Sequence, residues 1–351
     1  MHRGVRRRVT GVLRLGAILA VFLVPGERLA VAQTPATTLE KVKARGHLEC
    51  GVSQGVPGFS SPDSAGHWTG LDVDFCRAIA AAIFDHPTKV RMLPLSPTDR
   101  FTALQSGLID VLARNTTWTL QRDASLGFNF SVVTYFDGQG FMVRKSLNVK
   151  SLAELSDASI CVGAGTTTEM NLSDYFRANK MKYEPVVFGT GDEALKAYDA
   201  GRCDVLTADA SALNAYRGKL QRPDDQVVLP EIISKEPLGP VVRHGDDQWL
   251  DIVKWTHFAM LTAEELNITK ANVDEMARSD RPEVRRVLGI DNNGGQSLGL
   301  TADWVARIVR QVGNYGEVFD RNLGPSTPLK IARGLNAQWS KGGLQYAPPI
   351  R

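Results

Sequence analysis

Two segments of this chain, 94 residues apart, carry the same pattern of residues. The eleven residues that begin at Ala103 and the eleven that begin at Ala197 have Ala, Gly, Asp, Val and Leu at the same five positions. In each segment a helix is expected to end at a glycine, and a short apolar strand follows it. One repeat at so long an offset indicates two lobes of similar topology rather than an array of short repeats.

Strands and helices are expected to alternate in both lobes. The expected strands are 48–52, 90–95, 109–113, 159–162, 185–188 and 204–207. The expected helices are 70–83, 96–107, one that begins near 167, and 192–201. Ser96 is the expected N-cap of the second helix, with Pro97 in its first turn. This alternation predicts an α/β fold in which each lobe is a mostly parallel sheet flanked by helices.

The same offset relates two polar residues, Asn115 and Asp209. Each follows the third expected strand of its lobe. Ligands of open α/β sheets bind outside the carboxyl ends of the strands, so both side chains would face one cleft if the lobes face each other. The alternative is that both residues are ordinary loop caps.

Length and charge narrow the class of protein. The 351 residues are enough for two domains. Residues 1–32 hold six of the 41 basic residues and one of the 38 acidic residues, so the rest of the chain has a net charge of −2. A nearly neutral chain has no electrostatic reason to bind nucleic acid.

The N-terminus has the pattern of an export signal. Basic residues at 2–8 precede an apolar stretch from Val9 to Val24 that only Arg14 interrupts, and the small residues Ala30 and Ala32 stand at positions −3 and −1 before Gln33. We expect residues 1–32 to be a cleaved signal peptide and the mature protein to lie outside the cytoplasm. A membrane anchor is the alternative, but the apolar stretch is shorter than the roughly 20 residues of a spanning helix.

The four cysteines, Cys50, Cys76, Cys161 and Cys203, all lie in the mature chain. Their spacings match no zinc site, and an even number in an oxidising compartment suggests two disulfides. Of the three possible pairings we favour Cys50–Cys76 and Cys161–Cys203, because each bond then stays within one lobe. Cys161 and Cys203 would lie on neighbouring strands. Four unpaired thiols are the alternative.

Three features of the expected cleft suit a ligand that carries both charges. Arg122 follows a hydroxyl-rich run at a strand end, where its guanidinium can hold a carboxylate through two hydrogen bonds. Residues 165–168, Gly-Thr-Thr-Thr, open a helix whose N-terminus favours an anion, although N-capping alone would also explain the threonines. Asp209 adds a negative charge. A cation, an anion site and an acid together suit a zwitterion.

Motifs for catalysis and for cofactors are absent from the sequence. It has no GxSxG, CxxC, HExxH or phosphate-loop motif, and its six histidines are scattered. Ser53 and Cys161 have no visible base beside them. We therefore expect no catalytic residue, no metal and no cofactor.

The segment from Gly70 to Ile83, GLDVDFCRAIAAAI, resembles the signature of the family 3 extracellular solute-binding proteins, the periplasmic amino-acid receptors of ABC importers. The run before Arg122, the Gly-Thr-Thr turn and the segment that ends at Asp209 match that family in order and spacing. Longer stretches, including RNTTWTLQRD and SKEPLGPVVR, resemble those of receptors with general specificity for L-amino acids.

The resemblance implies roles in binding the ligand backbone. Arg122 would grip the α-carboxylate, and Thr117 and the backbone N–H of Thr167 would complete that part of the site. Asp209 would accept the α-ammonium group. Asn115 would form hydrogen bonds to the backbone part of the ligand.

The resemblance also implies how the ligand side chain is treated. Phe59 matches an aromatic residue that packs on it. Arg100 matches a position that meets the side-chain carboxylate in relatives that bind glutamate and aspartate; the alternative is a solvated helix arginine. Ser53 and Val56 stand where receptors for basic amino acids have an acid and a stacking tyrosine. The resemblance therefore implies broad specificity rather than a receptor for lysine, arginine or histidine.

The family fold implies the two-lobed type II periplasmic-binding-protein architecture, with the ligand cleft between the lobes. The chain would cross between lobes near 136–140 and return near 235–238. Trp304, Tyr315, Phe319 and Trp339, in the long tail, would add helices to lobe one. Lobe one would comprise 33–137 and 238–351, and lobe two 138–237.

The expected function is that of the periplasmic substrate-binding component of an ABC importer for L-amino acids. The lobes would close on the ligand, and the inner-membrane permease subunits would recognise the closed form. We expect a monomer. One alternative is an exported enzyme on the same scaffold, such as a dehydratase, for which the sequence supplies no acid–base pair. Another is a sensor-linked amino-acid receptor, which would use the same binding residues.

Overall fold

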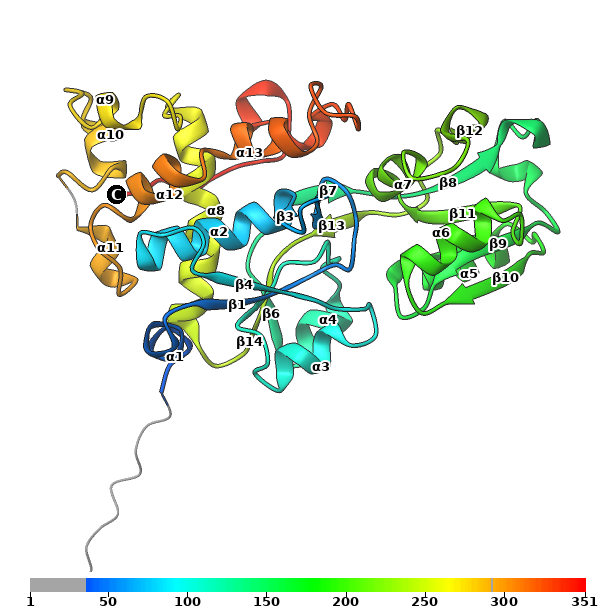
Figure 1. The fold of residues 1–351 in the computed structure, drawn as a ribbon, viewed down its shortest axis with the longest axis horizontal. Coiled ribbons are helices and arrows are strands. Elements are labelled where there is room, and N and C mark those ends of the chain that lie inside the picture. The colour runs from blue at the N-terminus through cyan, green and yellow to red at the C-terminus, as the bar shows by residue number, and fades with distance from the viewer. Residues whose placement is uncertain (1–35, 292) are drawn as a thin grey trace, which may run out of the picture. The chain divides into compact units, whose positions relative to one another are not determined.

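The computed structural model describes residues 36–291 and 293–351 (Figure 1). The expected signal peptide, residues 1–32, lies outside the described residues. The described chain contains two five-stranded sheets with helices packed against each. We call the part built on the first sheet lobe one, and the part built on the second sheet lobe two.

The sheet of lobe one has three parallel strands followed by two antiparallel pairings. Its strand order is β4 (Val90–Pro94), β1 (Leu48–Val52), β5 (Val111–Leu112), β14 (Val241–Arg243) and β6 (Phe128–Phe130). A small hairpin is formed by β2 (Ser61–Pro62) and β3 (Trp68–Thr69). The first helices are α1 (Thr38–Arg45), α2 (Leu71–Phe84), α3 (Arg100–Gln105) and α4 (Leu120–Ser125).

The sheet of lobe two repeats this plan. Its order is β10 (Glu184–Phe188), β9 (Ser159–Gly163), β11 (Val205–Asp209), β8 (Gln139–Arg144) and β12 (Gln226–Val228). The helices α5 (Thr167–Ala178), α6 (Gly191–Asp199) and α7 (Ala210–Arg217) pack on these strands. Among the three parallel strands of each lobe, the first along the chain (β1 or β9) lies between the second (β4 or β10) and the third (β5 or β11). The repeat seen in the sequence covers the last helix and the last strand of each parallel set, α3 and β5 in lobe one and α6 and β11 in lobe two. The predicted α/β class is confirmed.

Local contacts decide where two helices of lobe one begin. A Cβ atom on Gly70 would lie 2.1 Å from the carbonyl oxygen of Phe59, so only glycine fits before α2. The helix expected from Ser96 begins later, at Arg100. The Oγ of Ser96 does accept a hydrogen bond from the backbone N–H of Asp99 at 3.1 Å, but it closes a turn that precedes the helix. The predicted N-cap at Ser96 is therefore wrong.

Two short antiparallel strands connect the sheets, β7 (Tyr135–Asp137) and β13 (Glu236–Leu238), with Phe136 opposite Pro237 (Figure 1). β7 lies between β6 of the first sheet and β8 of the second, and β13 leads back from β12 to β14. This connectivity supports our proposed lobe boundaries, with lobe two at 138–237.

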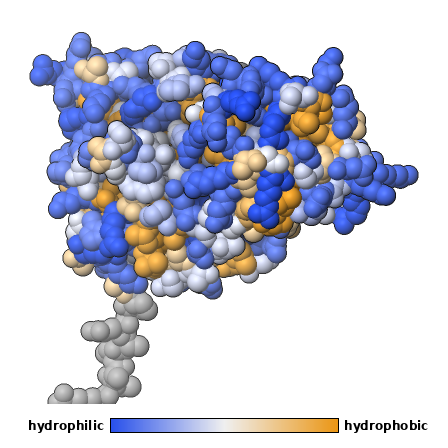
Figure 2. Space-filling view, turned by 45° about the vertical axis from the view of Figure 1, so that its right-hand side comes forward, coloured by the Kyte–Doolittle hydropathy of each residue, from blue (hydrophilic) through white to orange (hydrophobic). Residues whose placement is uncertain are grey.

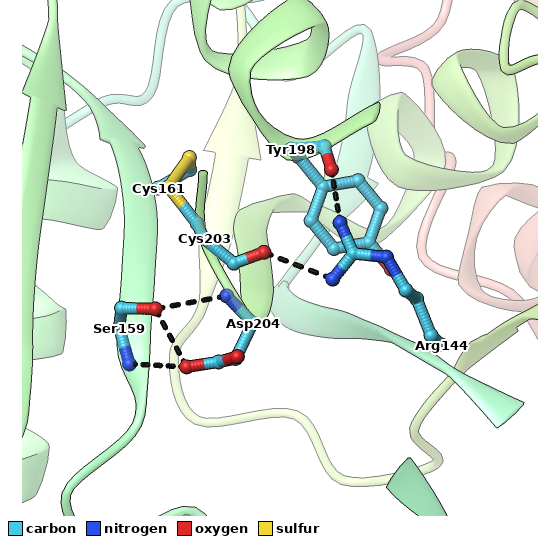
Figure 3. Close-up of a disulfide and its surroundings, with 6 residues drawn as sticks. All are labelled: Arg144, Ser159, Cys161, Tyr198, Cys203 and Asp204. Atoms are coloured by element: carbon cyan, nitrogen blue, oxygen red, sulfur yellow. Dashed lines mark hydrogen bonds between the residues drawn. A yellow bond between two sulfur atoms is a disulfide. The ribbon is translucent and has the colours of Figure 1, made fainter. Parts of the chain in front are cut away.

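The structure contains two disulfides, Cys50–Cys76 and Cys161–Cys203, which is the pairing that the sequence favours. Cys161 lies in β9, whereas Cys203 precedes β11 by two residues rather than lying in it. Hydrogen bonds surround the second disulfide (Figure 3): the carbonyl oxygen of Cys203 accepts from Arg144 at 3.0 Å, and Asp204 is paired with Ser159. The bond therefore joins the middle of β9 to the segment just before β11, next to the hydrogen bonds between Asp204 and Ser159.

The tail after β14 packs largely on α2. Its helices are α8 (Asp247–Glu265), α9 (Val273–Met276), α10 (Pro282–Val287), α11 (Gly294–Ser297), α12 (Trp304–Gln311) and α13 (Tyr315–Asn322). α8, α12 and α13 contact α2. Trp304, Tyr315 and Phe319 are buried in that core, as expected. Trp339 is not: it is 55% exposed in a 3₁₀ turn, so its predicted place in a packed helix is wrong.

Short 3₁₀ helices complete the described chain. They are η1 (Lys145–Leu147), η2 (Leu152–Glu154), η3 (Pro223–Asp225), η4 (Gly334–Asn336) and η5 (Trp339–Lys341). The face seen in Figure 2 is mostly hydrophilic, and its hydrophobic residues form separate groups. Among residues 36–291 and 293–351, no helix is both long and apolar enough to cross a membrane.

Candidate ligand-binding site

A cavity of about 90 Å³ is lined by residues from both lobes. Six of the seven residues predicted to bind the ligand line it: Arg100, Asn115, Thr117 and Arg122 from lobe one, and Thr167 and Asp209 from lobe two. Asn115 and Asp209, related by the 94-residue offset, thus line one cavity.

Phe59 is the exception. It does not line the cavity: its side chain is 1% exposed, and its ring packs edge-on against Tyr135, with 5.1 Å between the centroids. The apolar residue that lines the cavity from this loop is Val56. The expected packing of Phe59 on a ligand side chain therefore does not fit this structure, because the ring is used in the core of lobe one.

Arg122 is oriented by its own backbone segment. The Oγ1 of Thr119 caps α4 by accepting from the N–H of Arg122 at 3.2 Å. The guanidinium Nη1 donates to the carbonyl oxygen of Thr117 at 2.9 Å. Burial lowers the pKa of Arg122, and the charges of Glu236 and Asp209 oppose that shift. The side chain is thus a buried, pre-oriented cation, which suits a carboxylate.

Thr167 is the first residue of α5, a helix of 12 residues capped by Thr166. The backbone N–H groups of a first turn have no partner within the helix, and the helix dipole favours an anion there. The Oγ1 of Thr167 lies 3.2 Å from the Oγ1 of Thr117 in lobe one. Two threonine hydroxyls, one from each lobe, therefore meet at the N-terminus of α5.

Asp209 ends β11 and is 8% exposed. Burial raises its pKa well above the ordinary value, and the nearby carboxylates of Asp137 and Glu236 raise it further. Asn115 and the charge of Arg100 act in the opposite direction. Asp137 is itself shifted, to a pKa of about 6, mainly by burial. A buried carboxylate in such surroundings is well suited to accept a cationic group of a ligand.

Sequence reasoning missed Arg114, which is 9% exposed and lines the same cavity. Burial lowers its pKa to about 10, so it is still a cation at neutral pH. Its position directly before Asn115, at a strand end, was a usable signal. Arg100 is also buried, and it reaches the carbonyl oxygen of Gly165 at 3.4 Å. The cavity therefore has three guanidinium groups.

A second missed residue is Glu236, in the returning strand β13. Its Oε2 accepts hydrogen bonds from the hydroxyls of Thr117 at 2.6 Å and Thr167 at 2.8 Å. Its Oε1 accepts from Asn171 at 2.8 Å and Ser234 at 2.6 Å. One carboxylate thus joins lobe one, lobe two and the connecting strand. From the sequence we predicted only that the chain returns to lobe one near this segment.

Among the described residues, no group of three or more His, Cys, Asp or Glu side chains is arranged to hold a metal ion. The groups that line the cavity are suited to binding a ligand. Arginine side chains and the N-terminus of α5 lie at one part of it, and the buried carboxylate of Asp209 lies at another. Two similar lobes on paired connecting strands, with such a cavity between them, define a two-lobed solute-binding protein.

The chain belongs to the bacterial extracellular solute-binding proteins, family 3, whose sequence profile matches residues 48–271. The resemblance seen in the sequence is thereby confirmed, and with it the type II fold. Members of this family are extracellular or periplasmic binding proteins, so the enzyme alternative is not favoured.

Individual relatives cover nearly the whole chain. It is 62% identical to the general L-amino acid-binding periplasmic protein AapJ of Rhizobium johnstonii, over 95% of this chain and 98% of that protein. It is 53% identical to the glutamate/glutamine/aspartate/asparagine-binding protein BztA of Rhodobacter capsulatus, over 92% and 96%. A solved ABC transporter periplasmic binding protein from Brucella ovis, with glutathione bound, has a TM-score of 0.89 and 59% identity, over 90% of this chain and 100% of that one.

Proposed function

We propose that this protein is the substrate-binding component of an ABC importer for L-amino acids and that it binds the zwitterionic head of its ligand. The observation that carries the proposal is the meeting of opposite charges in one cavity. Arg122, Thr117 and the α5 N-terminus at Thr167 would hold the α-carboxylate, and Asp209, with Asn115, would hold the α-ammonium group.

Broad specificity follows from what holds each part of the ligand. The groups assigned to the head are charged, buried and held in place, whereas Phe59 is withdrawn into the core and leaves the side chain few fixed contacts. Arg100 remains a candidate partner for a side-chain carboxylate. The names of the relatives agree with this range, since AapJ is a general receptor and BztA a receptor for two acids and their amides. The relative that holds glutathione extends the range to a peptide.

Binding would act through closure of the lobes. Thr117 and Arg122 belong to lobe one, and Thr167 and Asp209 to lobe two, so a ligand that contacts both stabilises the closed state. The permease subunits would distinguish that state from the open one. We further propose that residues 1–32 are removed after export, that the mature protein acts in the periplasm as a monomer, and that it needs no cofactor.

The test is a thermal-shift and calorimetric titration of the mature chain after removal of co-purified ligand. A ligand that binds only the folded state stabilises it by mass action and so raises the melting temperature. The gain in stability is about 3 kcal/mol when the ligand concentration is 100 times Kd. We expect shifts with chemically different L-amino acids and none with their D-isomers or with amino acids that are amidated at the α-carboxyl group. No shift with any amino acid would overturn the proposal.

A variant pair tests the assigned contact. Asp209→Asn removes the charge that would face the ammonium group and should weaken binding at least tenfold, because hydrogen bonds to charged groups contribute about 1.5–3 kcal/mol. Asp224→Asn, at an exposed position of η3, is the matched control and should bind as the native chain does. Equal affinities of the two variants would remove Asp209 from the site.

A further inference from the structure

A second cavity, of about 200 Å³, adjoins the first. Four residues line both cavities: Val56, Arg114, Gly191 and Tyr216. None of them is a group assigned to the ligand head, so the head and the shared wall are different parts of the first cavity. A ligand that is held by its head and extended through this wall would enter the second cavity.

The shared wall contains a buried cation with unused hydrogen-bond donors. Arg114 is 9% exposed, and its Nε donates to the carbonyl oxygen of Leu95 at 2.9 Å. No other residue of the described chain accepts a hydrogen bond from its guanidinium. Because an arginine has five N–H donors, the terminal nitrogens of Arg114 are available to an acceptor on a ligand.

The opposite side of the wall is formed by Tyr216 and Gly191. A Cβ atom on Gly191 would lie 2.4 Å from the Oη of Tyr216, so the phenol rests directly above this glycine. A bulkier residue would have to displace the ring. The phenol offers one further donor for a ligand oxygen.

The second cavity is also bounded by both lobes. Gly55 from lobe one and Asp192 from lobe two line it, and Lys219 joins them. The Nζ of Lys219 donates to the carbonyl oxygen of Gly55 at 2.6 Å and lies 3.1 Å from Oδ1 of Asp192. Because residues of both lobes line it, the second cavity closes together with the first.

We propose that the second cavity is a subsite for a substituent on the ligand side chain, so that the cleft accepts γ-glutamyl peptides as well as free amino acids. The inference rests on the proposed function, since it needs the glutamyl α-carboxylate and α-ammonium in the first cavity. The γ-amide oxygen would lie at the shared wall and accept from Arg114 or Tyr216. The attached residue would occupy the second cavity.

Recognition of the free α-amino and α-carboxyl groups should distinguish two isomeric peptides. γ-L-Glutamylglycine keeps the free α-amino and α-carboxyl groups on one carbon. α-L-Glutamylglycine has the same composition, but its glutamyl α-carboxyl group is consumed in the peptide bond. Calorimetric titration of the native chain with both peptides, L-glutamine and L-glutamate needs no variant. We expect the γ-peptide to bind within about tenfold of L-glutamine, and the α-peptide at least 100-fold more weakly.

Three other results would each contradict one or both of the proposals. Binding of L-glutamine without the γ-peptide would overturn the subsite and leave the proposed function intact. Equal affinities for the two peptides would overturn the proposed subsite, because they would mean that the α-amino and α-carboxyl groups of the glutamyl residue are not recognised. Binding of neither amino acids nor peptides would overturn both proposals.

A variant locates the subsite. Gly191→Ala places a methyl group against Tyr216 in the first turn of α6, where alanine suits the helix. It should lower the affinity for the γ-peptide relative to that for L-glutamine by about tenfold or more. Gly189→Ala, whose methyl group would lie 3.4 Å from the flexible end of Glu193, is the matched control and should leave the ratio unchanged. An unchanged ratio in Gly191→Ala would place the attached residue elsewhere.

Discussion

Asp72, near the start of α2, positions the loop that presents Asn115 to the cavity. Its Oδ2 accepts from the backbone N–H of Asn115 at 2.8 Å, and Asn115 has a left-handed backbone with φ of 32°. Burial raises the pKa of Asp72 from 3.8 to about 7, although the hydrogen bond and the charge of Arg114 act against the shift. The folded chain therefore holds a proton that the unfolded chain has released between about pH 4 and pH 7.

The raised pKa of Asp72 predicts that the stability of the protein depends on pH. With a raised pKa in the folded state, the contribution of Asp72 is fully present below pH 4 and is lost as the pH rises to about 7. Asp72→Asn keeps an acceptor for Asn115 without the charge. As the pH rises through this window, the free energy of unfolding of the variant should therefore increase relative to that of the native chain, by roughly 1 kcal/mol per pH unit. Urea unfolding at pH 4.5, 6 and 7.5 measures the difference. A difference that stays constant with pH, or one also seen in the exposed Asp224→Asn control, would contradict the assignment.

At the residue scale, sequence reasoning succeeded where backbone topology fixes the position and failed where packing does. Asn115 and Asp209 were found because equivalent strand ends of two similar lobes line one cavity. Phe59 was assigned by resemblance alone, and the core of lobe one takes its ring instead. Arg114 was overlooked because an arginine next to a strand end is usually solvated, and only the tertiary structure shows that this one is buried.

At the scale of elements, the connecting strand β13 carries the group that joins the lobes. The carboxylate of Glu236 accepts four hydrogen bonds, two of them from threonine hydroxyls that belong to different lobes. Hydrogen bonds to a charged acceptor are about twice as strong as neutral ones. This contact between the lobes is therefore stabilised by a residue that need not touch the ligand.

Glu236→Gln should shift the population toward the open state. The amide replaces one acceptor oxygen by a donor, so at least one of the four hydrogen bonds is lost, at a cost of about 1–2 kcal/mol. We expect amino-acid affinity to fall about tenfold through a faster dissociation rate, with the association rate little changed, in stopped-flow fluorescence. Glu231→Gln is the control, because Glu231 bonds to the backbone of Leu152 at 3.3 Å within lobe two. A slower association rate with an unchanged dissociation rate would refute this role.

The elements themselves were largely predictable, because strands and helices alternate at regular lengths in the sequence. The six predicted strands are all present, and none of their ends is displaced by more than two residues. The misplaced start of α3 has a local cause, since Ser96 and Pro97 are equally suited to a helix cap and to the turn that they form. The pairing of β7 with β13 joins residues about 100 positions apart and has no local signal.

At the scale of the whole molecule, the end of the chain returns to the connection between the lobes. The side-chain amide of Asn336, 3% exposed, accepts from the N–H of Phe136 at 2.7 Å and donates to its carbonyl oxygen at 3.1 Å. The amide of Gln345 lies 3.3 Å from the carbonyl oxygen of Val133, just before β7. The tail was predicted to pack on lobe one, but its pairing with β7 was not, because only the folded chain brings residues 200 apart into contact.

This contact predicts that the tail stabilises the connecting strands. Asn336→Leu leaves the N–H and the carbonyl of Phe136 without their partner, which costs about 1–3 kcal/mol for buried groups. The melting temperature should fall by several degrees, and amide exchange should accelerate in β7 and β13 more than in the central strands β1 and β9. Leu335→Asn, at the adjacent exposed residue, should change neither quantity. Uniform acceleration of exchange would mean that the tail stabilises the molecule as a whole, whereas acceleration confined to β7 and β13 would show that it holds the connection about which the lobes close.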